Sequence, residues 1–244
     1  MAEKSDCLTA SYRVKSTDVT VLRTMRLSTL LKLSQEATVR HTTLLGMGRE
    51  FTLDRGLLWV ITQQELRINR LPAYDEEITI KTRPGKQLHL FFPRYTEFIS
   101  EGQVLVEIKT LWILIDEKTR KAVFPDKYGI HIEGVSDPND FPLPRIKSPS
   151  GEPEIKRNSK ALYSECDLNG HINNSRYFDI CDDLLGKEDH EKFSHDFRIN
   201  AEYSEEILID NDYQSELFRS DDESLLFQGL SNGKSMFRIL YSKN

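Results

Sequence analysis

A proline-rich stretch divides the chain into two parts, and it limits the possible folds more than any other feature. Five of the nine prolines of this 244-residue chain lie between Asp137 and Pro153. Proline fixes φ and has no backbone N–H to donate, so such a stretch cannot run through the interior of a sheet. We therefore predict a first lobe over residues 1–136, a linker over 137–158 and a shorter second lobe over 159–244.

The first lobe has the pattern of a strand, a helix and then several more strands. A strand candidate spans Leu8–Val14. Apolar residues then recur at helical spacing and predict a helix, which Gly46 and Gly48 end. These apolar residues are Leu27, Leu30, Leu31, Leu33, Ala37 and Val39. Runs rich in β-branched and aromatic residues follow, and they predict four strands at Leu57–Asn69, Glu77–Thr82, Leu88–Ser100 and Gln103–Asp116.

The second lobe repeats this order. A strand candidate at Lys160–Cys166 leads into a helix predicted from about Asn174 to Leu185. The dipeptide Asn232-Gly233 is typical of a hairpin turn between two strands. Four strand-like runs are expected in this lobe, at Asp196–Tyr203, Asp212–Arg219, Ser224–Leu230 and Met236–Tyr241.

Short sequence matches suggest that the two lobes arose by duplication. Arg67-Ile68-Asn69 is followed by a Tyr-x-Glu-Glu-Ile run from Tyr74, and Arg198-Ile199-Asn200 is followed by the same run from Tyr203. Asp18-Val19-Thr20 stands before the first helix as Asp167-Leu168-Asn169 stands before the second. The repeated order of one helix and several antiparallel strands predicts an α+β fold.

Composition and charge exclude several classes of protein. The net charge of −6 argues against a nucleic-acid binder. No apolar run approaches the roughly 18 residues of a membrane span, and the N-terminal residues lack the apolar stretch of a signal peptide. The three cysteines, Cys7, Cys166 and Cys181, form neither a disulfide framework nor a metal motif. We expect a cytoplasmic protein without metal or cofactor.

The run from Glu165 to Tyr177 concentrates the groups that could carry chemistry. It reads Glu-Cys-Asp-Leu-Asn-Gly-His-Ile-Asn-Asn-Ser-Arg-Tyr and lies where the second-lobe strand hands over to the helix. Gly170 permits a tight backbone path, and Asn173 or Asn174 can cap the helix. The free N–H groups at a helix start suit a developing oxyanion.

This run closely resembles the active-site segment of plant and bacterial acyl-acyl-carrier-protein thioesterases. The first lobe is similar to the same family at Gly56–Val60, at Leu71-Pro72 and from Trp112 to Lys121. The resemblance implies two tandem hotdog lobes in one chain, each a long helix wrapped by an antiparallel β-sheet. It also implies hydrolysis of a fatty acyl thioester on acyl carrier protein in fatty acid biosynthesis, without a cofactor.

The resemblance implies four catalytic residues in the second lobe: Asp167, Asn169, His171 and Glu206. Glu206 lies in the segment Glu-Tyr-Ser-Glu-Glu-Ile, where plant members often have a cysteine at the place of Ile207, so a cysteine nucleophile at that position is excluded. Glu206 is then a general base or a direct nucleophile, and the sequence leaves both open. Asn169 can orient the water or the carbonyl, His171 can polarise the carbonyl or move a proton, and Asp167 can orient the ring.

The first lobe lacks these groups. Aligned on Asp18, it offers Thr20 and Leu22 in place of the amide and the imidazole. We therefore expect a degenerate first lobe that shapes an acyl pocket with Trp59 and with Phe91 and Phe92. The first 140 residues carry 20 Lys and Arg against 19 Asp and Glu, the remainder 13 against 20, so an acidic carrier should dock on the first lobe. The candidate contacts are Arg83, Lys86, Arg94, Lys118, Arg120, Lys121 and Lys127.

Three other functions fit part of this sequence. An acyl-CoA thioesterase would differ only in the carrier, and a non-catalytic acyl-binding hotdog protein would not need the four polar residues. A hotdog dehydratase would use a histidine pattern that this run does not match. Neither the preferred acyl chain nor the choice between monomer and homodimer follows from the sequence.

Overall fold

One antiparallel sheet of ten strands runs through the part of the chain that the computed structural model describes, residues 6–135 and 143–243. The strand order is β1-β3-β4-β5-β2-β7-β10-β9-β8-β6. The first half contains β1 (Leu8–Arg13), β2 (Leu57–Arg70), β3 (Glu77–Pro84), β4 (Phe91–Ser100) and β5 (Gln103–Asp116). The second half contains β6 (Ile155–Lys160), β7 (His195–Tyr203), β8 (Asp212–Arg219), β9 (Leu225–Ser231) and β10 (Lys234–Lys243).

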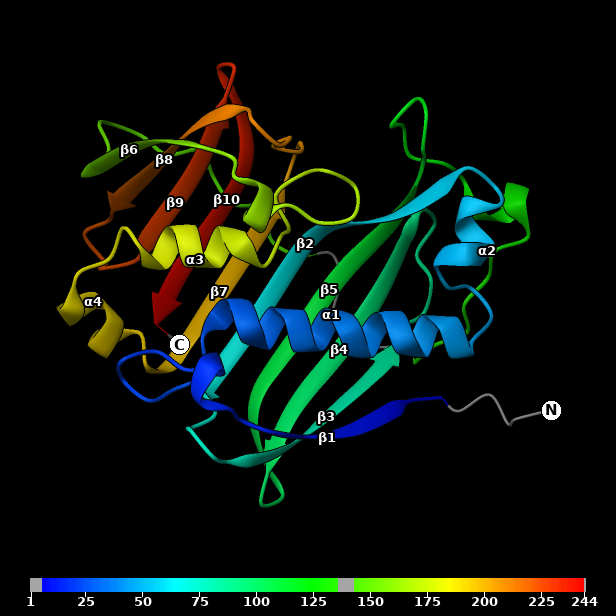
Figure 1. Ribbon diagram of the computed structural model, residues 1–244, viewed down its shortest axis with the longest axis horizontal. Coiled ribbons are helices and arrows are strands. Elements are labelled where there is room, and N and C mark those ends of the chain that lie inside the picture. Colours follow the sequence, from blue (N-terminus) through cyan, green and yellow to red (C-terminus); the bar gives the residue numbers. More distant parts are fainter. Residues whose placement is uncertain (1–5, 136–142, 244) are drawn as a thin grey trace.

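The first half agrees closely with the sequence prediction. The helix α1 (Leu27–Leu44) lies across one face of the sheet, and the short helix α2 (Arg49–Leu53) follows it, just before the start of β2 (Figure 1). Leu27, Leu30 and Leu31 point into the core at 5% exposure or less, whereas Val39 is exposed. The 3.6-residue period therefore identified the buried face of the helix, although not every apolar residue on it.

Two expectations for the second half were wrong. The strand expected at Lys160–Cys166 is β6, which lies earlier and enters the range assigned to the linker; residues Tyr163–Glu165 form a 3₁₀ turn instead. In that turn the side chain of Glu165 accepts a hydrogen bond from the N–H of Leu162, which competes with an extended conformation. The exposed, polar outer face of this edge strand gave no buried pattern to recognise.

The second helix lies where it was predicted, between Asn174 and Leu185, but it is shorter than expected. The helix α3 spans only Arg176–Asp182, and α4 (Lys187–Lys192), which was not expected, follows after Gly186. The N-cap of α3 is Ser175, not Asn173 or Asn174, and Asn173 precedes it and accepts hydrogen bonds from the N–H and hydroxyl of Ser175. Asp183, at its C-cap, places a carboxylate where the helix dipole disfavours negative charge, and the last turn contains no basic residue.

The two halves of the sheet meet where β2 pairs with β7, from Gln63 opposite Glu202 to Arg70 opposite His195. The strand pairing of the first half repeats in the second half. Arg13, the last residue of β1, lies opposite Glu77, the first residue of β3, and Lys160, the last residue of β6, lies opposite Asp212, the first residue of β8. This register equates residue 77 with residue 212. The matched Arg-Ile-Asn and Tyr-x-Glu-Glu-Ile segments are four to six residues out of that register, so they are not equivalent positions.

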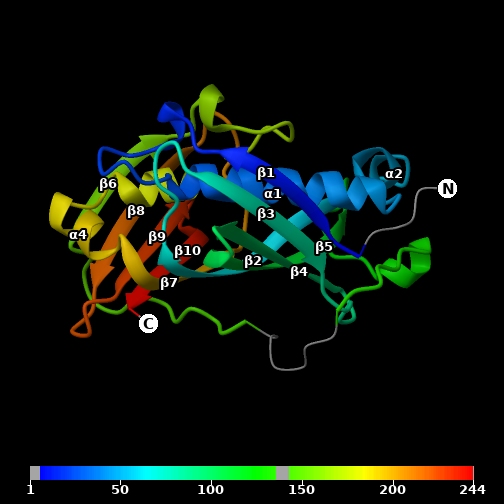
Figure 2. The ribbon, with the colours of Figure 1, turned by 90° about the horizontal axis from the view of Figure 1, so that it is seen from below.

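The segment after residue 142 crosses the sheet on the side opposite α1 (Figure 2). Leu143 and Ile146 are buried there. The N–H of Ile146 donates to Glu202 Oε1 at 2.9 Å, and Arg238 Nη1 donates to the carbonyl of Ile146 at 3.2 Å. The linker predicted over 137–158 is thus fixed to the sheet over this part, while its residues 137–142 lie outside the described ranges. Over 6–135 and 143–243, no helix is long and apolar enough to cross a bilayer.

Candidate active site

A tight loop between β6 and α3 carries three of the four predicted residues. The N–H of Asp167 donates to the carbonyl of His171 at 2.9 Å, and the N–H of Gly170 donates back to the carbonyl of Asp167 at 3.0 Å. Gly170 has φ 79°, a left-handed conformation that a side chain disfavours. The loop therefore brings Asp167, Asn169 and His171 to one side of a single turn.

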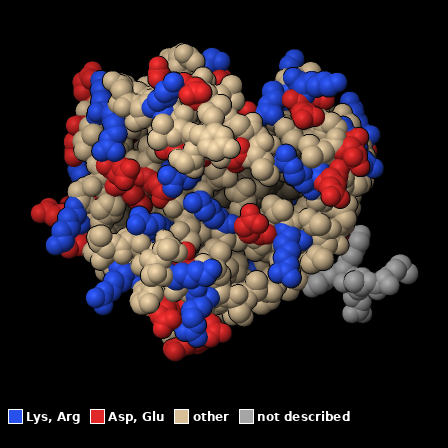
Figure 3. Space-filling view, viewed as in Figure 1, with Lys and Arg blue, Asp and Glu red and all other residues tan. Residues whose placement is uncertain are grey.

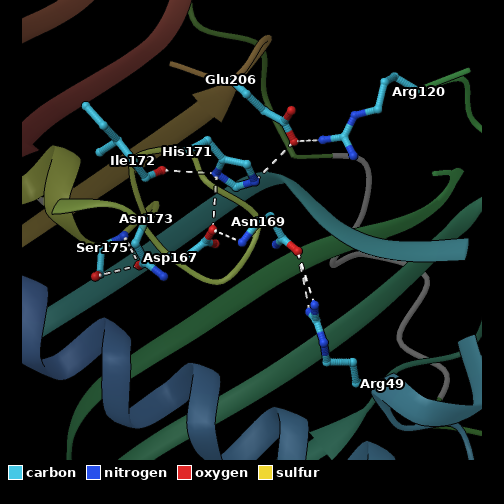
Figure 4. A network of polar contacts seen from close by, with 9 residues as sticks. All are labelled: Arg49, Arg120, Asp167, Asn169, His171, Ile172, Asn173, Ser175 and Glu206. Atoms are coloured by element: carbon cyan, nitrogen blue, oxygen red, sulfur yellow. Dashed lines mark hydrogen bonds and ion pairs between the residues drawn. The ribbon is translucent and has the colours of Figure 1, made fainter. Parts of the chain in front are cut away.

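His171 lies between two carboxylates. Its Nε2 is 3.2 Å from Glu206 Oε1, and its Nδ1 is 3.8 Å from Asp167 Oδ1 and 3.4 Å from the carbonyl oxygen of Ile172 (Figure 4). Both ring nitrogens thus face acceptors, which favours the doubly protonated ring. Burial lowers the pKa of His171, but the hydrogen bond with Glu206 and the charge of Asp167 outweigh it and raise the pKa above its usual value.

Glu206 also contacts the first half of the molecule. Arg120 Nη2 donates to Oε1 of Glu206, the same oxygen that faces His171, so Oε2 is the oxygen left to meet a water (Figure 4). Burial alone would raise the pKa of Glu206, but His171 and Arg120 together hold it below its usual value. The carboxylate is therefore ionised at neutral pH.

Asn169 is reached from the opposite side. The guanidinium of Arg49, on α2, lies 3.4 and 3.5 Å from Asn169 Oδ1, and the backbone N–H of Asn169 donates to Asp167 Oδ1 at 2.8 Å. Because the amide oxygen faces Arg49, the amide NH₂ is the group that can donate to a ligand. Two arginines of the first half, Arg49 and Arg120, thus each contact one predicted catalytic residue of the second half.

A cavity of about 630 Å³ opens beside this loop, within the size range of ligand sites. Asp167 and Asn169 line it, and His171 and Glu206, which do not, contact each other next to this loop. The rest of its wall comes from α1, α2 and the strands of the first half, and Trp59 and Phe92 form an edge-to-face pair there. In the space-filling view a notch separates the two upper parts of this face, with basic residues on its edge (Figure 3).

The first half contains the same turn without the chemistry. The N–H of Thr20 donates to the carbonyl of Thr24, as that of Asp167 does to His171, and the N–H of Leu22 donates to Thr20 Oγ1, as that of Asn169 does to Asp167. These bonds equate Thr20, Leu22 and Thr24 with Asp167, Asn169 and His171. The alignment on Asp18 was therefore two residues out.

The counterpart of Glu206 follows from the same kind of bond. The N–H of Met25 donates to the carbonyl of Pro72, as that of Ile172 does to Ile207, so Leu71 holds the place of Glu206. Leu71 is buried. The turn of the first half thus retains no group that could titrate at any of the four positions.

Several residues have roles that the sequence did not indicate. Arg94 was expected on the surface as a carrier contact, but it is 4% exposed and lines the cavity. Arg120 contacts Glu206, and Arg49 was not singled out, because no sequence pattern relates it to a residue 120 positions away. Cys166 lines the cavity, but burial and the charges of Glu165 and Asp167 raise the pKa of its thiol, which weakens it as a nucleophile.

Family comparison covers most of the chain. The family model described as "Acyl-ACP thioesterase N-terminal domain" matches residues 5–127, and that described as "Acyl-ACP thioesterase C-terminal domain" matches residues 150–232. A chloroplastic acyl-[acyl-carrier-protein] hydrolase of Cuphea viscosissima is 24% identical over 187 residues, which are 68% of this chain and 44% of that protein. The chain thus spans less than half the length of this relative. A dodecanoyl-[acyl-carrier-protein] hydrolase of Cinnamomum camphora is 21% identical and covers 84% of this chain and 57% of its own.

Solved structures resemble the whole described fold. An acyl-ACP thioesterase from Bacteroides thetaiotaomicron has a TM-score of 0.84 at 20% identity and covers 100% of both chains. A putative oleoyl thioesterase from Lactobacillus plantarum has a TM-score of 0.84 at 21% identity, covering 99% of this chain and 98% of its own. These likenesses show the fold, an α+β hotdog type with a large antiparallel sheet.

Proposed function

The chain belongs to the acyl-acyl-carrier-protein thioesterase family, and from this membership we propose that it hydrolyses fatty acyl thioesters of acyl carrier protein. The products are a free fatty acid and the carrier thiol. The observation that carries the proposal is the 3.2 Å contact between His171 Nε2 and Glu206 Oε1, beside a cavity lined by Asp167 and Asn169. A carboxylate from beyond β7 and an imidazole from the loop thus serve one site.

In the proposed reaction Glu206 acts as the general base. Its Oε2 takes a proton from a water molecule while the water oxygen attacks the thioester carbonyl carbon. The NH₂ of Asn169, held in orientation by Arg49, donates to the oxyanion that forms. The imidazolium of His171, held by Asp167, lies next to the base and stabilises the same negative charge.

Collapse of the tetrahedral intermediate breaks the carbon–sulfur bond. The thiolate that leaves takes a proton, and His171 is the group placed to give it, since it is protonated and adjacent to Glu206. The proton that Glu206 received then restores the imidazolium. No metal or cofactor takes part in this scheme, and one water is consumed for each thioester.

We propose that the two halves are tandem hotdog lobes, of which only the second is catalytic. The repeated strand register and the repeated turn support an origin by duplication. The first lobe corresponds to residues 1–136, and we move the start of the second lobe from residue 159 to β6 at Ile155. Leu71 and Leu22, in place of a carboxylate and an amide, account for the loss of chemistry in the first lobe.

We place the carrier on the first lobe. Lys86, Lys118, Lys121 and Lys127 are exposed there, whereas Arg94 is buried and Arg120 contacts Glu206, so the last two no longer belong to the docking surface. A cytoplasmic location stays a prediction, and "chloroplastic" in the names of the plant relatives describes those proteins. Whether the chain acts as a monomer or a homodimer is left to measurement of its mass in solution.

The choice of carrier separates the proposed function from its nearest alternatives. We expect the purified chain to release free thiol from acyl carrier protein loaded with fatty acyl groups of several lengths. Turnover of the matching acyl-CoA should be slower, because coenzyme A lacks the acidic protein surface that basic side chains attract. Faster turnover of acyl-CoA would assign the chain to the coenzyme A thioesterases, and no turnover of either would leave an acyl-binding protein.

Arg120 should set the acid limb of the pH profile. The change Arg120→Gln removes the guanidinium that helps to hold the pKa of Glu206 below its usual value, so that pKa should rise. The base must be ionised to act, and activity is lost as pH falls through its pKa. The acid limb of kcat against pH should therefore move to higher pH in the variant.

Lys121→Gln is the matched control, because it removes an adjacent, exposed positive charge. Its acid limb should stay with that of the wild type. If Arg120→Gln lowered kcat by the same factor at every pH, the role of Arg120 would be to position the polypeptide or the substrate, and not to lower the pKa of Glu206.

A further inference from the structure

A buried positive charge forms part of the cavity wall. Arg94, in β4, is 4% exposed and lines the 630 Å³ cavity together with aromatic and aliphatic side chains. Burial lowers its pKa from the usual value to about 10, so it stays charged at neutral pH. An unsubstituted fatty acyl tail offers nothing but methylene groups to such a charge.

The contacts of Arg94 are with neutral groups. Its Nη1 lies 2.7 Å from His41 Nδ1, and its Nη2 donates to Thr42 Oγ1 at 3.0 Å. A guanidinium only donates, so His41 Nδ1 is the accepting nitrogen and that ring is neutral. Among the residues that the structure describes, no carboxylate is recorded in an ion pair with Arg94, whose pKa is shifted by burial alone.

This arrangement is costly for an empty or purely apolar cavity. Moving a charge from water into an apolar site is unfavourable unless hydrogen bonds and an opposite charge or strong acceptor compensate. A purely structural role, in which Arg94 joins β4 to α1 by hydrogen bonds, would need only a neutral donor at this position. The cavity wall contains a second buried donor, the neutral Nε1 of Trp112, which has no hydrogen-bond partner within the described residues.

Resting on the proposed function, we propose that the cavity selects acyl chains that carry an oxygen function remote from the thioester, a hydroxyl, oxo or carboxylate group that accepts from Arg94. Asn169 lies at the wall formed by the loop of the second half. Arg94 lies on β4, a strand of the first half. The thioester and the oxygen function are thus recognised at different walls of one cavity.

Binding can be tested without turnover. Acyl-pantetheine analogues in which an amide replaces the thioester are titrated calorimetrically into the full chain, unsubstituted or with a hydroxyl, oxo or terminal carboxylate group, at several chain lengths. We expect at least one oxygenated analogue to bind about tenfold or more tightly than the unsubstituted chain of equal length. Walking the hydroxyl along the chain should give one preferred position.

Variants identify the residue responsible. Arg94→Met should abolish the preference, Arg94→Lys should retain part of it, and Arg157→Met, which removes an exposed arginine of the edge strand β6, should leave it intact. Equal binding of oxygenated and plain chains by the wild type would overturn the inference, as would a preference that survives in Arg94→Met. If Arg94→Met does not fold, the wild-type comparison and Arg94→Lys still decide.

The outcome is separate from that of the proposed function. Hydrolysis of plain and oxygenated acyl carrier protein at equal rates would keep the enzyme and remove the selectivity. Arg94-dependent binding of oxygenated analogues, with no hydrolysis of any loaded carrier, would keep the cavity assignment and remove the reaction.

Discussion

The change Glu206→Gln should lower kcat for acyl carrier protein hydrolysis by about 10²- to 10⁴-fold, the usual contribution of a general base. The amide of glutamine keeps the size of the side chain and can still contact His171 and Arg120, but it cannot take a proton from water. The loss should therefore appear in kcat with little change in KM or in the thermal midpoint of unfolding. Steady-state kinetics at neutral pH measure it.

Glu205→Gln is the internal control, because the amino-acid sequence alone does not distinguish Glu205 from Glu206 as the candidate base. Glu205 is adjacent in sequence, but it is exposed and pairs with Lys234 at 3.0 Å. Its replacement should leave kcat within a factor of two or so, as expected for a surface substitution. Comparable losses in both variants would refute the proposed base.

A single turnover in ¹⁸O-labelled water separates the two roles that the sequence left open for Glu206. If Glu206 is a base, the label enters only the released fatty acid. If it is a nucleophile, it forms a mixed anhydride with the acyl group, and attack of water on the Glu206 carbonyl of that anhydride leaves the label on Glu206. Mass spectrometry of the peptide detects this label, which a general base never acquires.

The local chemistry of the site could be predicted because it lies in one short run of sequence. Asp167, Asn169 and His171 fall within five residues, and the turn that joins them is a local structure with a glycine at the required position. Glu206 was predicted only through a family likeness, since nothing in its own neighbourhood separates it from Glu205. The structure puts Glu206 3.2 Å from His171, which is consistent with that assignment.

The contacts across the cavity could not be predicted in the same way. Arg49 reaches Asn169 and Arg120 reaches Glu206 over long sequence separations, and single exposed-looking arginines carry no periodic signal. Arg94 was assigned to the surface because its charge suggested exposure, which is the usual case. Its burial follows from where β4 lies in the sheet and from the α1 groups that meet it.

The limits of strands and helices could also be predicted where local sequence determines them, but not where they depend on contacts with distant residues. The strand Gln103–Asp116 was predicted with its observed limits, because β-branched and apolar residues fill it and Gly102 forms the turn before it. The edge strand β6 has mostly exposed side chains, so its existence depends on pairing with β8 and not on a pattern of its own. The short α3 likewise ends at Asp183, and the effect of a carboxylate on a helix terminus is not visible in apolar periodicity.

The largest expected effect on stability comes from Phe237, on β10. Its side chain is 1% exposed, and its ring centre lies 4.2 Å from that of Tyr177 on α3. Phe237→Ala should destabilise the fold by about 3–5 kcal/mol, the range for losing a buried aromatic ring. Because α3 directly follows the loop that holds His171, activity should fall with it. Phe91→Ala, on an aromatic residue that is 39% exposed, should cost much less and is the matched control.

Gly229, which lies opposite Phe237, allows a test of how the Phe237 ring packs, beyond the effect of removing the ring. Gly229 on β9 pairs with Phe237 in register, and a Cβ at Gly229 would lie 2.1 Å from Phe237 Cε1, so the ring occupies the space that a side chain would need. Gly229→Ala alone should destabilise by about 1–3 kcal/mol through overpacking. Combined with Phe237→Leu, which vacates that space, the methyl group should be accommodated. The two changes should then cost less together than the sum of their separate costs, by about 0.5–3 kcal/mol in denaturant unfolding. Strictly additive costs would mean that Gly229 is required by the backbone and not by the ring above it.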